Sequence, residues 1–143
     1  MTRFEGPEES PGFLLWRVTL AWQRAMRAAL APHDLTHVQF VLLASLWWLE
    51  NHGGSPSQQR LAAQAGTDSM MTSQVLRKLE DRGLLTRSVD PADSRARLLS
   101  LTAAGERLVG AAMKDVEDAD AAYFAKLGEP QQFLRGLAEL TRE

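Results

Sequence analysis

The chain has 143 residues, and none of them is cysteine. A chain without thiols has no disulfide, no thiolate metal site, no cysteine nucleophile and no thiol-based redox sensor. No apolar run approaches the roughly 20 residues that span a bilayer. The acidic start MTRFEGPEES contains no apolar stretch of the kind found in signal peptides. We therefore expect a cytoplasmic protein with no membrane partner.

Residues suited to catalysis are also scarce. There are three histidines, no glycine-rich phosphate loop and no compelling order of serine, histidine and aspartate. His33 and His37 are four residues apart, but Pro32 and the cap at Thr36 put a helix boundary between them. We interpret these two histidines and His52 as structural, and expect no enzymatic activity, no metal and no cofactor. We interpret one acidic cluster as a solvated helix face: Asp115, Glu117, Asp118 and Asp120.

What the chain does contain is the composition of one globular domain, with 45% hydrophobic and 24% charged residues. The net charge is −2, but it is distributed unevenly. Between Ser57 and Leu101 there are seven basic and five acidic residues, so that segment is +2 and the remainder is −4. Two copies of a modestly basic module can accumulate enough phosphate contacts to bind a nucleic acid.

The middle of the chain predicts a helix-turn-helix. The first helix spans Gln58–Ala65, Gly66 supplies the turn, and the second helix spans residues 68–82 and ends at Gly83. Side chains able to cap helix N-termini precede four predicted helices: Ser10, Thr36 (in a capping box with Gln39), Ser57 and Thr67.

Periodicity predicts which face of the second helix is free. Met71, Val75 and Leu79 recur every four residues and form the expected core face. At 100° per residue, the opposite face carries mostly short hydrogen-bonding side chains and one cation, which suit the base edges of a major groove. These residues are Ser69, Met70, Ser73, Gln74 and Arg77.

A β-hairpin is expected to follow, with strands over residues 84–89 and 97–101 and a turn at Asp90-Pro91. Its basic residues are placed to reach phosphates or a minor groove: Arg87, Arg95 and Arg97.

Three sequence runs occur in order: SQVLRKLEDRGLLTR, DPADSR and LSLTAAG. Together they resemble the MarR family of winged-helix transcriptional regulators, in which a recognition helix ends in Leu-Glu-x-x-Gly-Leu, a wing has Asp-x-x-Asp-x-Arg, and Leu-Thr-x-x-Gly opens the next helix. The matching residues are Leu79, Glu80, Gly83, Leu84, Asp90, Asp93, Arg95, Leu101, Thr102 and Gly105. The chain departs from the family at Ala92 and Ser94, where wings are commonly basic, and at Gln74, where many relatives carry arginine.

The remaining segments predict helices over residues 11–31, 36–51 and 103–126, and a short last helix. The first, long and last of these carry more apolar surface than one chain can bury, and the resemblance implies that they form a homodimer interface. We therefore predict one MarR-type domain over residues 1–143. Residues 10–31 and 103–143 are its dimerisation helices, and residues 34–101 are its winged helix-turn-helix lobe. The predicted fold class is mainly α with a small β-hairpin wing.

The resemblance implies a homodimeric repressor that binds a pseudo-palindromic DNA operator, with a small aromatic or amphipathic effector left open. Two alternatives also stay open: a winged-helix protein-interaction module without DNA binding, and a small-molecule or metal binder. The predicted DNA-binding residues are Ser57, Gln58, Ser69, Met70, Ser73, Gln74, Arg77, Lys78, Arg95 and Arg97. The candidate ligand-binding residues are Trp16, Trp22, Trp47 and Trp48, for which the alternative is ordinary packing.

Overall fold

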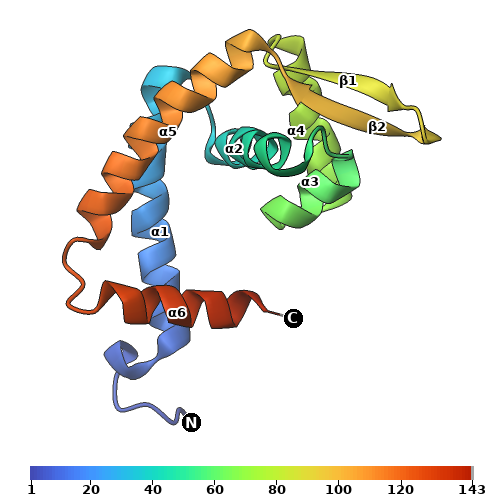
Figure 1. The fold of residues 1–143 in the computed structure, drawn as a ribbon. Coiled ribbons are helices and arrows are strands. Elements are labelled where there is room, and N and C mark those ends of the chain that lie inside the picture. Colours follow the sequence, from blue (N-terminus) through green and yellow to red (C-terminus); the bar gives the residue numbers. More distant parts are fainter. Residues whose placement is uncertain (143) are drawn as a thin grey trace.

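A computed structural model describes residues 1–142 and shows a mainly helical chain with one two-stranded hairpin, as predicted. In Figure 1, α1 and α5 run side by side as a long arm, and α6 crosses the end of α1 that lies farthest from the hairpin. The other helices and the hairpin form a lobe at the opposite end. The elements are the short 3₁₀ turns η1 (Pro7–Glu9) and η2 (Ala31–His33), the helices α1 (Pro11–Leu30), α2 (His37–Gly53), α3 (Gln58–Ala65), α4 (Ser69–Asp81), α5 (Ala103–Phe124) and α6 (Pro130–Thr141), and the strands β1 (Leu85–Asp90) and β2 (Asp93–Leu101).

Side chains cap three helix N-termini as predicted. The hydroxyl of Ser10 accepts a hydrogen bond from the backbone N–H of Phe13 at 3.2 Å. The hydroxyl of Ser57 accepts one from the backbone N–H of Arg60 at 3.1 Å. Thr36 forms the predicted capping box at the start of α2. These caps work because a short side chain satisfies an amide that has no partner inside the helix.

The predicted cap of α4 is wrong. Asp68, rather than Thr67, is the N-cap, and its carboxylate accepts the amide of Met71 at 2.8 Å. The hydroxyl of Thr67 instead bonds the hydroxyl of Thr72 at 2.6 Å. Because Asp68 is the cap, α4 begins at Ser69, one residue later than the sequence predicted. The anionic side chain of Asp68 also interacts favourably with the positive N-terminal end of the helix.

The predicted core face of α4 is rotated in the structure. Leu79 is buried as expected, but Thr72 and Leu76 are fully buried while Met71 is 40% exposed. A threonine can occupy this core position because its hydroxyl donates to the carbonyl of Asp68 at 2.7 Å, which leaves no polar atom without a partner. The apolar stripe of α4 is therefore completed by a residue whose polarity conceals it in the sequence.

The hairpin is antiparallel, with Leu85 opposite Leu101. Strand β2 begins four residues earlier than predicted because two carboxylates hold the turn. Asp90 accepts the amide of Ala92 at 2.9 Å, and Asp93 accepts the amide of Arg95 at 3.0 Å. Asp93 therefore stabilises the wing.

Helix α5 begins directly against the base of the hairpin. The hydroxyl of Thr102 accepts the amide of Gly105 at 3.0 Å and donates to the carbonyl of Gly83 at 2.6 Å. The amide of Thr102 donates to the carbonyl of Leu84 at 3.1 Å. A Cβ atom added to Gly105 would overlap that same carbonyl oxygen, so glycine is needed for the close approach.

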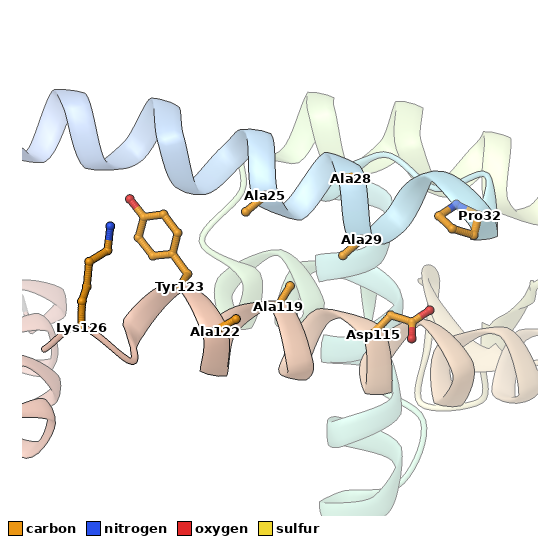
Figure 2. A pocket seen from close by; sticks show the side chains of 9 residues that line it. All are labelled: Ala25, Ala28, Ala29, Pro32, Asp115, Ala119, Ala122, Tyr123 and Lys126. Carbon is orange, nitrogen blue, oxygen red and sulfur yellow. The ribbon is translucent and has the colours of Figure 1, made fainter.

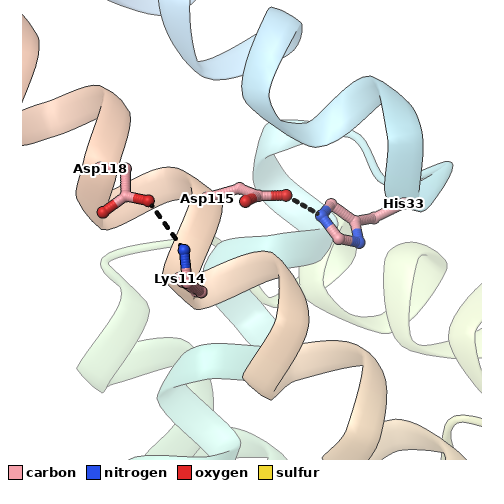
Figure 3. Close-up of polar contacts among 4 residues, drawn as sticks. All are labelled: His33, Lys114, Asp115 and Asp118. Atoms are coloured by element: carbon pink, nitrogen blue, oxygen red, sulfur yellow. Dashed lines mark hydrogen bonds and ion pairs between the residues drawn. The ribbon is translucent and has the colours of Figure 1, made fainter.

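The acidic cluster on α5 is not simply a solvated face. Asp115 lies 2.7 Å from Nε2 of His33, and Asp120 accepts the indole N–H of Trp22 at 2.8 Å, so both join α5 to the α1 side of the arm. Asp118 is exposed and pairs with Lys114 on its own helix at 3.2 Å. Figure 3 shows the His33–Asp115 and Lys114–Asp118 pairs. The solvated-face interpretation is therefore wrong for two of the four residues.

Much apolar surface on α1 and α6 is left exposed by the described residues 1–142. Helix α6 buries none of its residues, although its apolar side chains share one face. The exposed apolar side chains on α1 and α6 are Phe13, Leu14, Leu15, Trp16, Val18, Leu20, Phe133, Leu134, Leu137 and Leu140. Within residues 1–142, no helix is both long enough and apolar enough to cross a membrane.

Candidate nucleic-acid interface

The α3–α4 corner presents one face of α4 to solvent. Gly66 adopts a left-handed φ of 75° between the two helices, and Gly83 adopts φ 74° after α4. Four of the predicted base-facing or phosphate-facing residues of α4 are exposed, and Lys78 is exposed beside them. They are Ser69, Met70, Gln74 and Arg77.

Ser73 differs from these residues because it is half-buried on the flank of α4. Its hydroxyl accepts Nη2 of Arg77 at 3.4 Å, a long hydrogen bond that holds the guanidinium along the helix. The rotation of α4 thus leaves Met70, Gln74 and Arg77 at the centre of the outward face. Ser69 and Ser73 lie toward one side of it.

A groove lies between the start of α3 and the hairpin. Its lining brings together four predicted contact residues from two separate segments: Ser57, Gln58, Arg95 and Arg97. Arg95 is exposed, and Nη1 of Arg97 donates to the backbone carbonyls of Ser94 and Ala96 at 3.3 and 3.2 Å. The carboxylate of Asp93 also lines this groove, but the two guanidinium groups beside the N-terminus of a helix leave the surface positive and suited to a phosphate backbone.

Arg87 has a different role from the one predicted. Its Nε lies 3.2 Å from a carboxylate oxygen of Glu80 on α4, and its Nη1 donates to Oε1 of Gln58 on α3 at 3.2 Å. The side chain is mostly buried. Arg87 therefore connects the hairpin to both helices of the corner and is not free to reach a phosphate. Spacing in the sequence carried no signal for this pairing.

The four tryptophans do not gather at one site. Trp16 is 61% exposed on α1, and Trp48 is exposed and stacks on His52 with ring centroids 4.1 Å apart. Trp22 packs between α1 and α5, and Trp47 lies against α5 beside Val109. Within residues 1–142, the four tryptophans therefore do not line a common cavity that could hold a ligand.

A cavity of about 680 Å³ does open between α1 and α5. Figure 2 shows its alanine-rich walls, with Tyr123 and Lys126 at one end and Asp115 at the other. The ammonium of Lys126 lies 5.1 Å from the centre of the Tyr123 ring. None of the four tryptophans lines this cavity, and the sequence pattern did not indicate it, because small alanines carry no specific signal.

The histidines make the structural contacts that were expected. Nε2 of His33 contacts Asp115, and Nδ1 of His37 lies 2.8 Å from Oε1 of Gln23. Burial lowers the pKa of His37, and the nearby Asp120 carboxylate opposes that shift. No group of three or more potential metal ligands occurs within residues 1–142.

One carboxylate supports the hairpin from inside the lobe. Glu50 on α2 accepts the amide of Leu101 at 2.6 Å. Burial raises its pKa, the Leu101 amide opposes this, and the Glu106 carboxylate adds to it.

Comparison with known proteins gives concordant matches. The model of the MarR family matches residues 35–96. The HTH-type transcriptional regulator YdcH of Bacillus subtilis strain 168 is 48% identical over 99% of this chain and 96% of its own length. The transcriptional repressor CouR bound to a 23-mer DNA duplex is 27% identical, covers 99% of both chains and has a TM-score of 0.85. CouR from Rhodococcus jostii RHA1 bound to p-coumaroyl-CoA is 28% identical over 96% of this chain and 95% of CouR, with a TM-score of 0.83.

Proposed function

Because this chain belongs to the MarR family, we propose that it is a homodimeric transcriptional repressor that binds a pseudo-palindromic DNA operator. The observation that carries this proposal is the exposed face of α4, where Gln74 and Arg77 point outward beside a wing with two exposed arginines. The similar fold of CouR, which has been captured on a DNA duplex, supports it.

We assign dimerisation to residues 10–31 and 103–143, of which Glu143 lies outside the described residues, and DNA binding to residues 34–101. The exposed apolar side chains of α1 and α6 support this division, since a monomer rarely leaves such a surface in water. A second copy of the chain would cover it through a two-fold axis, because the same patch then serves both partners.

On DNA, the two copies of α4 would enter successive major grooves about 34 Å apart, one turn of the duplex. The amide of Gln74 can bond N6 and N7 of adenine, so we assign it the selection of an A·T pair in each half-site. Ser69, Ser73 and Arg77 would make supporting contacts to bases or phosphates. Phosphate contacts are assigned to a second group: Ser57, Gln58, Lys78, Arg95 and Arg97.

Control by a small aromatic or amphipathic effector is the finer part of this proposal. The complex of CouR with p-coumaroyl-CoA supports it, and so does the cavity between α1 and α5. That cavity lies between the two helices of the arm, α1 and α5. The packing of these helices would set the distance between the DNA-binding lobes of the two protomers. An effector needs a coupling free energy of only ~1–3 kcal/mol to change operator affinity appreciably.

The test is selection from a randomised duplex pool with wild-type protein, Gln74→Ala and Gln74→Arg. Gln74→Ala removes the side-chain amide and should weaken the free energy of binding to the best operator by roughly 1–3 kcal/mol, and that to random DNA by much less. The arginine variant should move the preference at one position of each half-site toward G·C. Gln131→Ala is the matched control, because Gln131 is exposed on α6 and lies outside residues 34–101, to which DNA binding is assigned.

Two results would count against the proposal. Identical half-site preferences in all three proteins would remove Gln74 from base recognition. Absence of salt-dependent binding to any duplex would favour the alternative of a protein-interaction module that kept the winged-helix fold.

A further inference from the structure

The sulfur atoms of this protein are distributed unusually. The chain has five methionines and no cysteine, so every sulfur is a thioether. Met26 is fully buried and Met113 is partly buried against the core. Apart from Met1 at the chain start, the exposed methionines are Met70 at 73% and Met71 at 40%, both in the first turn of α4.

Met70 is an exception on a polar surface. It lies on the same stripe of α4 as Gln74 and Arg77, four and seven residues later, opposite the buried Thr72. In the free protein its apolar side chain is in water, which is unfavourable. In a major groove, the apolar group that such a side chain can contact is the C5-methyl of thymine.

We propose that Met70 contacts a thymine methyl group in each half-site and that oxidation of its thioether by a peroxide releases the protein from DNA. This inference rests on the proposed DNA-binding function and adds to it a modification site and a chemical signal. The signal would act on the DNA-facing surface itself, without an effector cavity.

The chemistry is a two-electron transfer of one oxygen atom. With hydrogen peroxide, the sulfur lone pair of Met70 attacks one oxygen, the O–O bond breaks, and the proton of the transferred oxygen passes to the leaving hydroxide, which departs as water. The thioether is oxidised to a sulfoxide and the peroxide is reduced. The sulfoxide is polar and chiral, and methionine sulfoxide reductases convert it back to the thioether.

The effect on binding follows from the position of Met70. A sulfoxide oxygen facing a thymine methyl group would lose its water without gaining a hydrogen bond, and a polar group buried in that way is costly. A dimer carries two copies of the site, so the penalty applies twice. Met71 lies on the flank of the outward face and is less exposed, so its oxidation should matter less.

The experiment measures operator affinity before and after treatment with hydrogen peroxide for wild type, Met70→Leu, Met71→Leu and Met70→Gln. Mass spectrometry locates each added oxygen, and circular dichroism reports folding. We expect peroxide to weaken wild-type and Met71→Leu binding at least tenfold, and Met70→Leu binding less than twofold. Met70→Gln, which carries a polar group in place of the sulfur, should bind weakly before treatment and change little after it. A methionine sulfoxide reductase with dithiothreitol should restore the wild type.

The outcomes separate this inference from the proposed function. Unoxidised wild type that binds no duplex would overturn the proposed function. Wild type that binds equally well with Met70 shown to be a sulfoxide would overturn the inference alone. An equal loss in Met70→Leu would also overturn it, because the loss would then come from another oxidised residue or from unfolding.

Discussion

Replacing Leu76 with alanine tests the orientation of α4, on which the whole interface depends. The structure buries Leu76 completely, whereas sequence periodicity assigned the core position to Met71, which is 40% exposed. The two orientations predict opposite results for two substitutions of similar size. Leu76→Ala should be strongly destabilising, and Met71→Ala should be close to neutral.

The expected magnitude follows from the burial of the side chain. Leu76→Ala removes roughly three methylene equivalents at about 0.8 kcal/mol each, or ~2.4 kcal/mol of transfer free energy. The cavity that remains adds to this, and Leu→Ala substitutions in cores cost about 2–5 kcal/mol in total. For a chain of this size, a loss of about 3 kcal/mol lowers the Tm by roughly 6–12 °C. Met71→Ala should cost less than about 1 kcal/mol, since most surface substitutions lie near ±0.5 kcal/mol.

The assay is thermal unfolding followed by circular dichroism at one fixed protein concentration, because the Tm of a dimer depends on concentration. Operator binding by the two variants at 20 °C is the functional companion measurement. If Met71→Ala lowered the Tm as much as Leu76→Ala, the orientation of α4 described here would be wrong. In that orientation Ser73 and Arg77, rather than Gln74, would lie at the centre of the outward face.

Two further predictions concern the lobe and the arm. The pKa of Glu50 is raised in the folded protein, so its favourable contribution is complete below the unfolded pKa and is lost as the pH rises through the folded pKa. The Tm of Glu50→Gln relative to wild type should therefore be higher at pH 7 than at pH 4, and an equal difference at both pH values would contradict the burial argument. Leu137→Glu places a charge in the proposed dimer interface and should give monomers or aggregates in light scattering. Val89→Glu, at an exposed apolar residue of the hairpin, should leave the dimer intact, and an intact Leu137→Glu dimer would place the interface elsewhere.

Most features set by a capping or turn residue could be predicted, whereas features set by contacts that form only in the folded protein could not. Ser10, Thr36 and Ser57 were identified as caps because a capping side chain acts within three residues of itself. The left-handed turn at Gly66 was equally local.

The errors have a common physical origin. Thr72 was not predicted as a core residue because its hydroxyl is satisfied by Asp68 and Thr67, a pairing that exists only once α4 has formed. Arg87 was assigned to phosphates because its partners, Glu80 and Gln58, come from two other elements. In both cases the residue type alone predicts a solvent-facing side chain, whereas the observed position depends on hydrogen-bond partners. Those partners lie four and five residues earlier for Thr72 and in two other elements for Arg87.

The absence of a side chain at Gly105 has a mechanical consequence. Helix α5 has 22 residues and so behaves as a rigid rod about 33 Å long. At its hairpin end, the rod rests on the carbonyl of Leu84 and is bonded through Thr102, with no flexible linker between helix and strand. A tilt of about 5° would displace the far end of such a rod by about 3 Å. Because no flexible linker joins α5 to β2, we expect the base of the wing to turn with the helix, so that the angle between two paired arms would influence the angle between the two wings.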